Sequence, residues 1–105
     1  MKRIMYIEYK GGSLAGPGRI GWVELSKAKR SYRYNGKVLQ KCVGYKYNCF
    51  DAETGEHYWV SGPKRDGSDR LYGGVVEIDD DARDEYWTSI RKKPECSTLA
   101  SYTVR

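Results

Sequence analysis

An Asn-Gly pair predicts a tight hairpin turn in the first half of the chain and restricts how the flanking residues can fold. Asn35-Gly36 lies between two runs of strand-forming residues, Ser31–Tyr34 and Lys37–Gln40. Both central positions of a type I′ turn need positive φ angles, which Asn and Gly adopt more readily than other residues. The pair therefore predicts a two-residue β-hairpin.

Other parts of the chain also read as short strands separated by turn residues. A second hairpin is predicted from Tyr45–Asp51 and Glu56–Ser61, with Gly55 as the left-handed residue of its turn. Further strands are predicted at Arg3–Lys10, Arg19–Ser26 and Val75–Ile78. The composition agrees, because ten Tyr and three Trp residues suit the half-buried faces of a sheet.

One segment, Asp79–Lys93, has a helical period. Ala82, Tyr86 and Ile90 recur at every fourth position and form an apolar stripe. Acidic residues begin the segment and basic residues end it, which matches the helix dipole, and Pro94 stops it.

Together these elements predict a mainly β fold with one C-terminal helix. We expect a small SH3-like antiparallel barrel, and a strongly bent open sheet over the helix is the alternative. Residues 1–94 form the predicted domain, and residues 95–105 form a C-terminal tail. Within this tail, Tyr102–Val104 either adds an edge strand or stays disordered.

The charge distribution bears on the partner and the compartment. Lys and Arg outnumber Asp and Glu by 19 to 14, and in residues 1–50 the only acids are Glu8 and Glu24. A basic half can attract polyanions, although the two halves can also pack together and partly cancel. The odd number of cysteines is typical of a reducing compartment, and no apolar run is long enough for a signal peptide or a membrane span. We expect a cytoplasmic protein with no membrane partner; its oligomeric state stays open.

The candidates for catalysis, metal binding and cofactor binding are weak. His57 is the only histidine, and Cys49 comes near it only if the second hairpin has the right register. Cys42 and Cys96 complete a zinc-type ligand set, but the short spacing of a zinc knuckle is missing. The glycine-rich segment 11–18 lacks the spacing of a phosphate-binding loop. We therefore predict no catalytic residues, no metal and no cofactor.

The loop after Pro63 is the predicted binding surface. It carries both signs of charge, is framed by aromatic residues and follows a rigid hairpin, where small barrels often place binding residues. We expect it to engage another protein. The predicted binding residues are Trp59, Lys64, Arg65, Asp66, Asp69, Arg70 and Tyr72.

A basic face around the first hairpin gives the alternative, a nucleic-acid-binding barrel. Basic residues alternating with Tyr32 and Tyr34 can hold phosphates and stack bases. If both tyrosines fill the core, the basic residues are only a solvated face. The residues of this alternative are Lys27, Lys29, Arg30, Arg33 and Lys37. A small enzyme that uses Cys49 and His57 ranks last.

Four segments carry a resemblance to a known family: KRIMYIEYKGG, GRIGWVELSK, DAETGEHYWVSGPKRDGSDRLYGG and DDDARDEYWTSIRKKP. They resemble a family of small uncharacterised bacterial proteins, over most of residues 1–94, which implies a bacterial cytoplasmic source. Some members carry the name 1-deoxy-D-xylulose-5-phosphate synthase. A thiamine-diphosphate enzyme of that kind needs a large subunit and a GDG…N motif, and the nearest string here is Arg65-Asp66-Gly67. The family has no assigned activity, so the resemblance implies no catalytic residues, and we expect a non-catalytic binding module.

Overall fold

The computed structural model describes residues 1–12, 16–28, 30–70 and 72–105. Both predicted hairpin turns are present in it. Asn35 and Gly36 have φ angles of 50° and 78°, as a type I′ turn requires, and Gly55 has a φ angle of 80°. The turn signals in the sequence therefore fix the local geometry of both hairpins.

The described residues form eight strands. Their order follows the predicted pattern up to residue 78, but the predicted strand Tyr45–Asp51 is wrong over residues 45–48, which lie in a loop, and only Cys49–Asp51 pairs as a strand. The strands are β1 (Lys2–Tyr9), β2 (Gly18–Leu25), β3 (Ser31–Tyr34), β4 (Lys37–Lys41), β5 (Cys49–Asp51), β6 (His57–Ser61), β7 (Gly74–Ile78) and β8 (Ser101–Val104).

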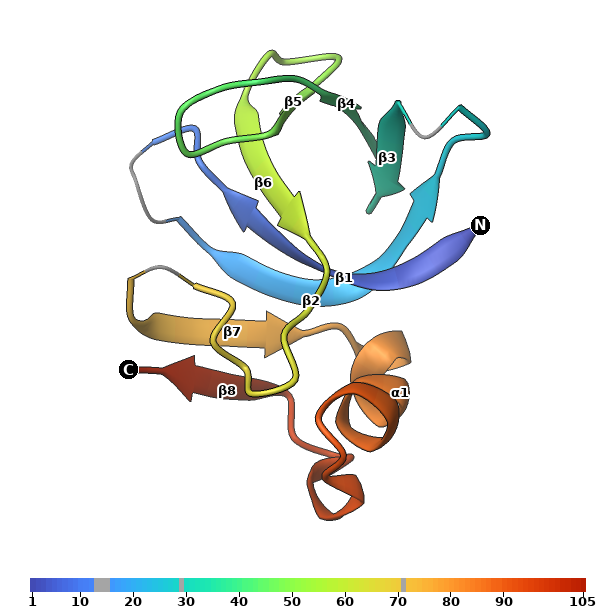
Figure 1. Cartoon of the computed structure of the whole chain (residues 1–105), viewed down its shortest axis with the longest axis vertical. Helices are drawn as coiled ribbons and strands as arrows, with labels where there is room; N and C mark the ends of the chain where they lie inside the picture. The colour runs from blue at the N-terminus through green and yellow to red at the C-terminus, as the bar shows by residue number, and fades with distance from the viewer. Residues whose placement is uncertain (13–15, 29, 71) are drawn as a thin grey trace.

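The first six of these strands close an antiparallel barrel. Their order is β1-β6-β5-β4-β3-β2, and β2 pairs with β1 to complete the ring. The long strand β2 also pairs in parallel with β7 through Gly18–Ile20, and β8 pairs with β7 at the outer edge. Figure 1 shows β7 and β8 as an extension beside the barrel, with the helical segment next to them. The prediction of a mainly β chain with a small antiparallel barrel is confirmed, in its closed form.

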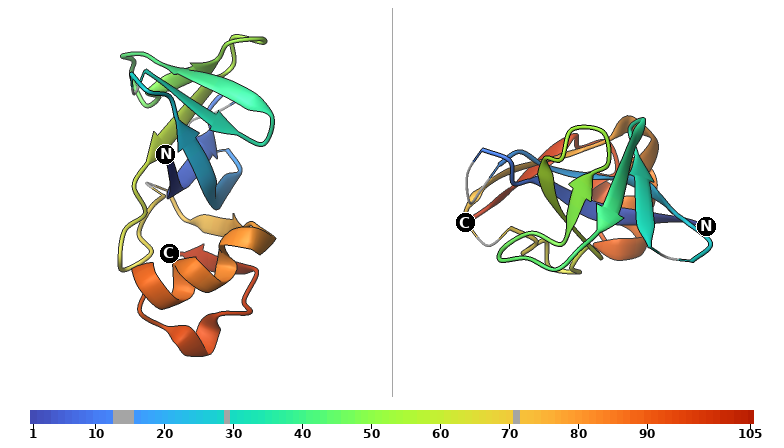
Figure 2. Two further views of the ribbon diagram at one scale, coloured as in Figure 1. Left: turned by 90° about the vertical axis from the view of Figure 1, so that its right-hand side faces the viewer. Right: turned by 90° about the horizontal axis from the view of Figure 1, so that it is seen from above.

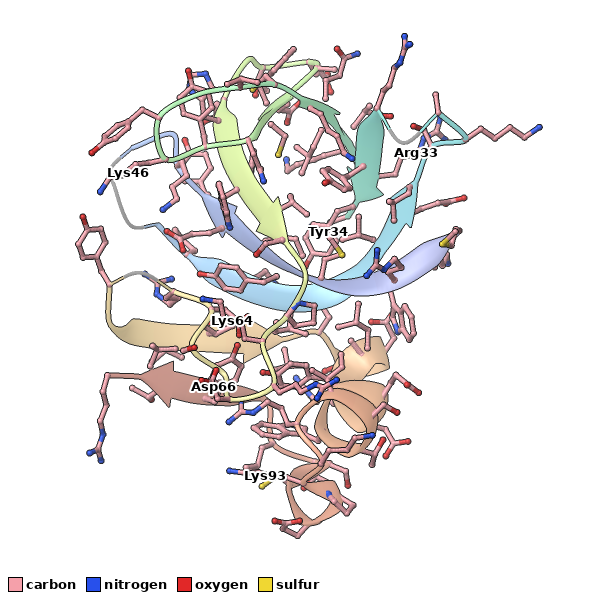
Figure 3. The ribbon with its side chains drawn as sticks, viewed as in Figure 1. Arg33, Tyr34, Lys46, Lys64, Asp66 and Lys93 are labelled. Atoms are coloured by element: carbon pink, nitrogen blue, oxygen red, sulfur yellow. The ribbon has the colours of Figure 1, made fainter. Side chains whose placement is uncertain are left out.

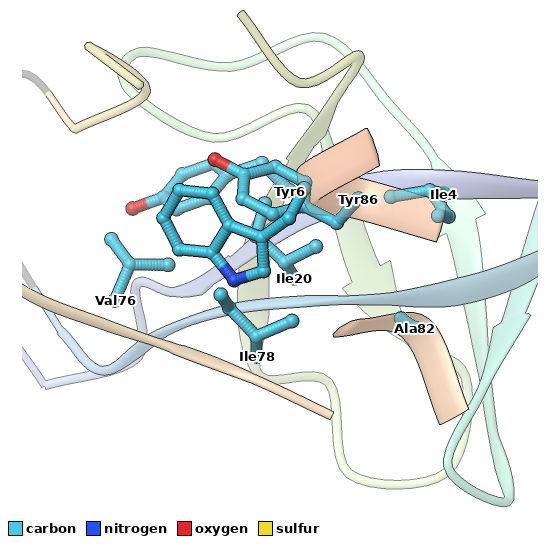
Figure 4. Close-up of a cluster of buried hydrophobic side chains, with 8 residues drawn as sticks. Ile4, Tyr6, Ile20, Val76, Ile78, Ala82 and Tyr86 are labelled. Atoms are coloured by element: carbon cyan, nitrogen blue, oxygen red, sulfur yellow. The ribbon is translucent and has the colours of Figure 1, made fainter. Parts of the chain in front are cut away.

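Two hydrophobic cores result from this arrangement, and β1 contributes to both. Met5 and Ile7 point into the barrel, where they pack with residues such as Leu39. Ile4 and Tyr6 point the other way, toward β7 and the helical segment. Figure 4 shows this second cluster, and Figure 2 shows the layer of β7, β8 and helix that covers it. A strand that is apolar on both faces is thereby covered on both faces.

The helical segment is shorter and less regular than predicted. It consists of a 3₁₀ turn (Asp80–Ala82), the short helix α1 (Arg83–Glu85) and a π turn (Tyr86–Ile90). The prediction of a helix to residue 93 is wrong by three residues, because Lys92 takes a left-handed backbone with a φ angle of 55° and ends it. None of the helices in the described part of the chain has the length and apolar character that a membrane crossing requires.

The C-terminal segment packs onto the rest of the chain. A 3₁₀ turn (Pro94–Cys96) leads into β8, so the edge strand is the alternative found for Tyr102–Val104. Trp87 Nε1 donates a hydrogen bond to the carbonyl oxygen of Leu99 over 3.0 Å. The ring of Tyr102 stacks on Tyr86, with 5.7 Å between ring centroids. The segment therefore helps to cover the second core.

Candidate binding cleft

The outer face of strands β1 and β6 forms the floor of a cleft. Their register places Glu8 opposite Trp59 and Tyr6 opposite Ser61. The loop that follows β6 passes in front of β7 and β8 in Figure 1, and its residues 62, 64 and 68–70 line the cavity beside this floor. The resulting cavity of about 520 Å³, called here the main cleft, is lined by Glu8, Lys10, Lys46, Trp59, Ser61, Gly62, Lys64, Ser68, Asp69 and Arg70.

A buried polar network lies at the floor of the main cleft. The hydroxyl of Tyr6 donates a hydrogen bond to Oε1 of Glu8 over 2.5 Å, and Nζ of Lys10 lies 2.6 Å from Oε2 of Glu8. The side chains of Lys10 and Glu8 are only 9% and 4% exposed. Burial and the neighbouring carboxylate of Glu8 raise the pKa of Tyr6 well above its usual range. Both oxygens of the Glu8 carboxylate are therefore engaged within the fold.

Asp69 fixes the loop that forms one wall of the main cleft. Its Oδ1 accepts a hydrogen bond from the backbone N–H of Lys64 over 2.7 Å, and its Oδ2 accepts one from the hydroxyl of Tyr102 over 2.7 Å. The tip of the same loop lies on Arg91, since a Cβ atom at Gly67 would come within 2.4 Å of the Arg91 guanidinium. The loop is thus attached to both β8 and the end of the helical segment.

Arg70 joins this loop to the segment just before β2. Its Nη1 donates to the carbonyl oxygen of Gly16 over 2.7 Å, and its Nε donates to that of Tyr72 over 3.2 Å. A Cβ atom at Gly18 would lie 2.6 Å from the Tyr6 hydroxyl oxygen and 2.9 Å from Nη1 of Arg70. Glycine at this position therefore allows Arg70 to approach the buried network of Tyr6.

Lys46 connects the two loops that border the main cleft. It lies in the loop between β4 and β5, whereas Lys64 lies in the loop between β6 and β7, as Figure 3 shows. Nζ of Lys46 donates to the hydroxyl of Tyr72 over 2.8 Å and lies 5.1 Å from the centre of that ring. The hydrogen bond with the Tyr72 hydroxyl raises the pKa of Lys46 above its ordinary value.

The main cleft has an excess of positive charge. Among the described residues that line it, four are cationic and two are acidic: Lys10, Lys46, Lys64 and Arg70 against Glu8 and Asp69. All four carboxylate oxygens accept hydrogen bonds or an ion pair from within the fold. Trp59, which is 36% exposed, supplies an aromatic surface beside these charges. The cleft can therefore hold an anionic group next to an apolar one.

The structure brings four of the seven predicted binding residues together. Trp59, Lys64, Asp69 and Arg70 all line the main cleft. Tyr72 does not line it, but contacts the cleft residue Lys46 at its border.

Arg65 and Asp66 lie elsewhere. Asp66 accepts hydrogen bonds from the backbone N–H and the hydroxyl of Ser68, over 2.9 and 2.6 Å, so it stabilises the turn. Arg65 lines a second cavity of about 420 Å³ between the barrel and the helical segment, called here the side hollow. Its lining residues are Arg3, Ile4, Trp22, Gly62, Pro63, Arg65, Glu85, Ser89 and Ile90.

Five side-chain positions in the main cleft were not predicted: Glu8, Lys10, Lys46, Ser61 and Ser68. A signal for Glu8 does exist in the sequence, because it shares a strand face with Ile4 and Tyr6 and a carboxylate on an apolar face needs a partner. Lys46 has no such signal. It lines the same cavity as Glu8 and Lys10 only in the folded barrel, where the loop between β4 and β5 comes near the end of β1.

The basic face of the nucleic-acid alternative lacks exposed aromatic rings. Lys27, Arg30, Arg33 and Lys37 are exposed, and Lys29 lies outside the described residues. Tyr32 is buried in the barrel core and Tyr34 packs against that core. Tyr34 also donates to Oδ2 of Asp79 over 2.6 Å. Figure 3 shows Arg33 and Tyr34 on different sides of β3. Neither tyrosine ring is therefore available to stack on a base.

Cys49 and His57 do not form a catalytic pair. His57 is paired with Phe50, so it points to the face of the hairpin opposite Cys49. The ring of His57 stacks on Tyr47 with 3.8 Å between centroids, while burial raises the pKa of the Cys49 thiol to about 12. Cys42, Cys49 and Cys96 are free thiols, and the described residues contain no group of three His, Cys, Asp or Glu side chains that could hold a metal.

Comparisons of the chain with protein-family models, with curated proteins and with solved structures find no match. The family resemblance of the sequence therefore stays a prediction. The description of the site rests on the geometry of the main cleft.

Proposed function

We propose that this protein is a non-catalytic binding module of the small SH3-like barrel type, which engages an acidic segment of a partner protein through the main cleft. The proposal rests on a difference between the acidic and the basic groups of the main cleft. The carboxylates of Glu8 and Asp69 are fully engaged by donors of the fold. The ammonium group of Lys64 forms no ion pair within the described part of the chain, and its side chain is exposed.

The kind of side chains in the main cleft supports a protein partner. Trp and Arg are the residues that most often dominate the binding energy of protein interfaces, and both are present as Trp59 and Arg70. The loop that carries Arg70 is fixed by the two hydrogen bonds of the Asp69 carboxylate and by the packing of Gly67 against Arg91. Little conformational entropy of this loop is therefore lost when a partner binds. The positions of His57 and Cys49 on opposite faces also favour binding over Cys/His chemistry.

A charge reversal tests the proposal. Affinity purification from the cells that make the protein, followed by binding measurements between the purified partners, compares the wild type with Lys64→Glu. Lys27→Glu is the matched control, since Lys27 is exposed, undergoes the same charge change and does not line the cleft. We expect Lys64→Glu to weaken binding by about tenfold and Lys27→Glu to change it little. Equal affinity for both variants, or no specific partner of the wild type, overturns the proposal.

Nucleic-acid binding is the second candidate, and one observation favours it. Four exposed cations lie on one hairpin and the turn before it: Lys27, Arg30, Arg33 and Lys37. Lys37 and Lys41 lie on the face of β4 opposite Arg33, since Lys37 is paired with Tyr34 and the Lys41 ammonium group lies 5.0 Å from the centre of the Tyr32 ring. These cations attract phosphates through charge alone, because the tyrosines of the hairpin are not available for stacking.

A further inference from the structure

We infer that the main cleft and the side hollow form one continuous track for an extended acidic peptide, which crosses the molecule over Gly62. This inference rests on the proposed function and names the form of its ligand. The starting observation is that Gly62 lines both cavities. They have volumes of about 520 and 420 Å³, so together they offer much more room than a single side chain needs.

The segment after β6 separates the two cavities, and its side chains alternate between them. Pro63 and Arg65 line the side hollow, whereas Lys64 lines the main cleft. This alternation is typical of an extended chain. Gly62 is the point where no side chain stands between the cavities. A Cβ atom placed there would meet nothing within 4 Å. A ligand can therefore pass from one cavity to the other at Gly62.

Both cavities have the same sign of charge. The main cleft has four cations against two carboxylates among its described lining residues, and the side hollow adds Arg3 and Arg65 against Glu85. Arg3 and Arg65 are exposed, so they remain accessible to a ligand. Each cavity also has one tryptophan, Trp59 in the main cleft and Trp22 in the side hollow. An extended peptide with several carboxylates and occasional apolar residues matches this repeated pattern.

The carboxylates within the track favour a peptide over a nucleic acid. Glu8, Asp69 and Glu85 lie beside the cations in the two cavities. A phosphate backbone carries a negative charge at every nucleotide and is repelled by each of these groups. A peptide backbone is neutral, and its carboxylates lie on flexible side chains that can turn toward the cations and away from these groups.

Labelled oligoglutamates test the track by fluorescence anisotropy. Octaglutamate extends over about 27 Å, close to the 30 Å intermediate dimension of the molecule, and tetraglutamate reaches half as far. We expect octaglutamate to bind about tenfold more tightly than tetraglutamate, because it engages both cavities at once. Lys64→Glu should weaken the binding of both peptides. Arg65→Glu should weaken the binding of octaglutamate only.

Gly62→Leu blocks the crossing point without removing a charge. Gly62 has no positive φ angle, and the space around its Cβ position is open, so the variant should fold. Gly12→Leu is the matched control, because Gly12 is also exposed with open space and lines neither cavity. We expect Gly62→Leu to lower the affinity for octaglutamate about tenfold and Gly12→Leu to leave it within about twofold. Circular dichroism confirms that both variants are folded.

The outcomes separate the track from the proposed function. Equal binding of the two peptides, with no effect of Arg65→Glu or Gly62→Leu, overturns the track and leaves the main cleft as the acidic site. If neither peptide binds, both the acidic ligand of the proposed function and the track are overturned. An oligothymidylate of eight nucleotides that binds more tightly than octaglutamate assigns the surface to nucleic acid and also overturns the track.

Discussion

The hydroxyl of Tyr102 donates a hydrogen bond to Oδ2 of Asp69 over 2.7 Å and so joins β8, near the end of the chain, to one wall of the main cleft. Asp69 also holds the backbone N–H of Lys64 through its Oδ1. The shape of the binding surface therefore depends on a strand that is far from it in the sequence.

Removing this hydroxyl should loosen the loop more than it destabilises the whole domain. For Tyr102→Phe we expect the free energy of unfolding to fall by about 1–2 kcal/mol, because a charge-assisted bond to a half-buried carboxylate is lost. Amide hydrogen exchange at Lys64 should also become faster. Tyr72→Phe is the control, since Tyr72 is 43% exposed, and its cost should be below about 0.5 kcal/mol. An equal cost of both variants in urea unfolding contradicts this prediction.

The local elements were predictable because their signals are local. Asn35-Gly36 and Gly55 determine two turns through their backbone angles, and the alternation of apolar residues determines which faces of the strands are buried. The stripe of Ala82 and Tyr86 is buried as the helical period predicts.

The pairings between distant segments were not predictable in the same way. The parallel pairing of β2 with β7 and the attachment of β8 to β7 depend on which edges remain free after the barrel closes. No local pattern specifies that choice. The main cleft has the same origin, because Glu8, Lys46 and Lys64 come from three separate parts of the chain. The sequence could place charged residues in the correct loop, but not the opposite wall of the cleft.

The buried thiol of Cys49 predicts a loss of stability at high pH. Burial, and to a smaller degree Cys42, raise its pKa in the folded state to about 12 from the ordinary value of 9.0. The folded protein thus holds this proton more tightly than the unfolded chain, and the stability gained is complete below pH 9 and lost as the pH rises toward 12. Urea unfolding at a series of pH values should show this decline. The raised pKa values of Tyr6 and Tyr102 act in the same direction, so Cys49→Ala should make the decline shallower without abolishing it.

The same thiol should resist alkylation. At mildly alkaline pH we expect iodoacetamide to modify Cys42 and Cys96, which are partly exposed, much faster than the fully buried Cys49. Cys49 should react only after denaturant is added. Peptide mapping by mass spectrometry measures the three rates, and equal rates in the folded protein contradict the buried position of Cys49.

Asp79 should be one of the most sensitive polar positions of the fold. Its Oδ1 accepts bonds from Nε and Nη2 of Arg19 over 2.9 and 2.6 Å, and its Oδ2 accepts one from Tyr34 over 2.6 Å. Asp79→Ala removes all three, and we expect it to lower the free energy of unfolding by about 2–3 kcal/mol, with a discount for partial exposure. Glu77→Ala is the matched control on the same cation. The Glu77 side chain is 64% exposed, so its loss should cost less than about 0.5 kcal/mol.

Gly21 provides an independent test of the contact between Asp79 and Tyr34. A Cβ atom at this position would lie 2.3 Å from Oδ2 of Asp79 and 2.6 Å from Cε1 of Tyr34. Gly21→Ala should therefore separate these two side chains and destabilise the fold by about 1–3 kcal/mol. In the Asp79→Ala background the added cost should be clearly smaller, because part of the obstruction is gone. Full additivity of the two substitutions contradicts the proposed geometry.

The basic face should bind polyanions only through charge. Tyr32 is buried and Tyr34 is bonded to Asp79, so neither ring is available to stack on a base. We expect the protein to be retained on heparin at low salt and released below about 0.15 M salt, where exposed charges are screened over distances longer than about 8 Å. The double variant Arg30→Glu, Arg33→Glu should be released earlier, since both side chains are exposed. Binding of oligothymidylate that persists at physiological salt and is lost in the double variant contradicts this prediction and favours the nucleic-acid function over the protein-binding one.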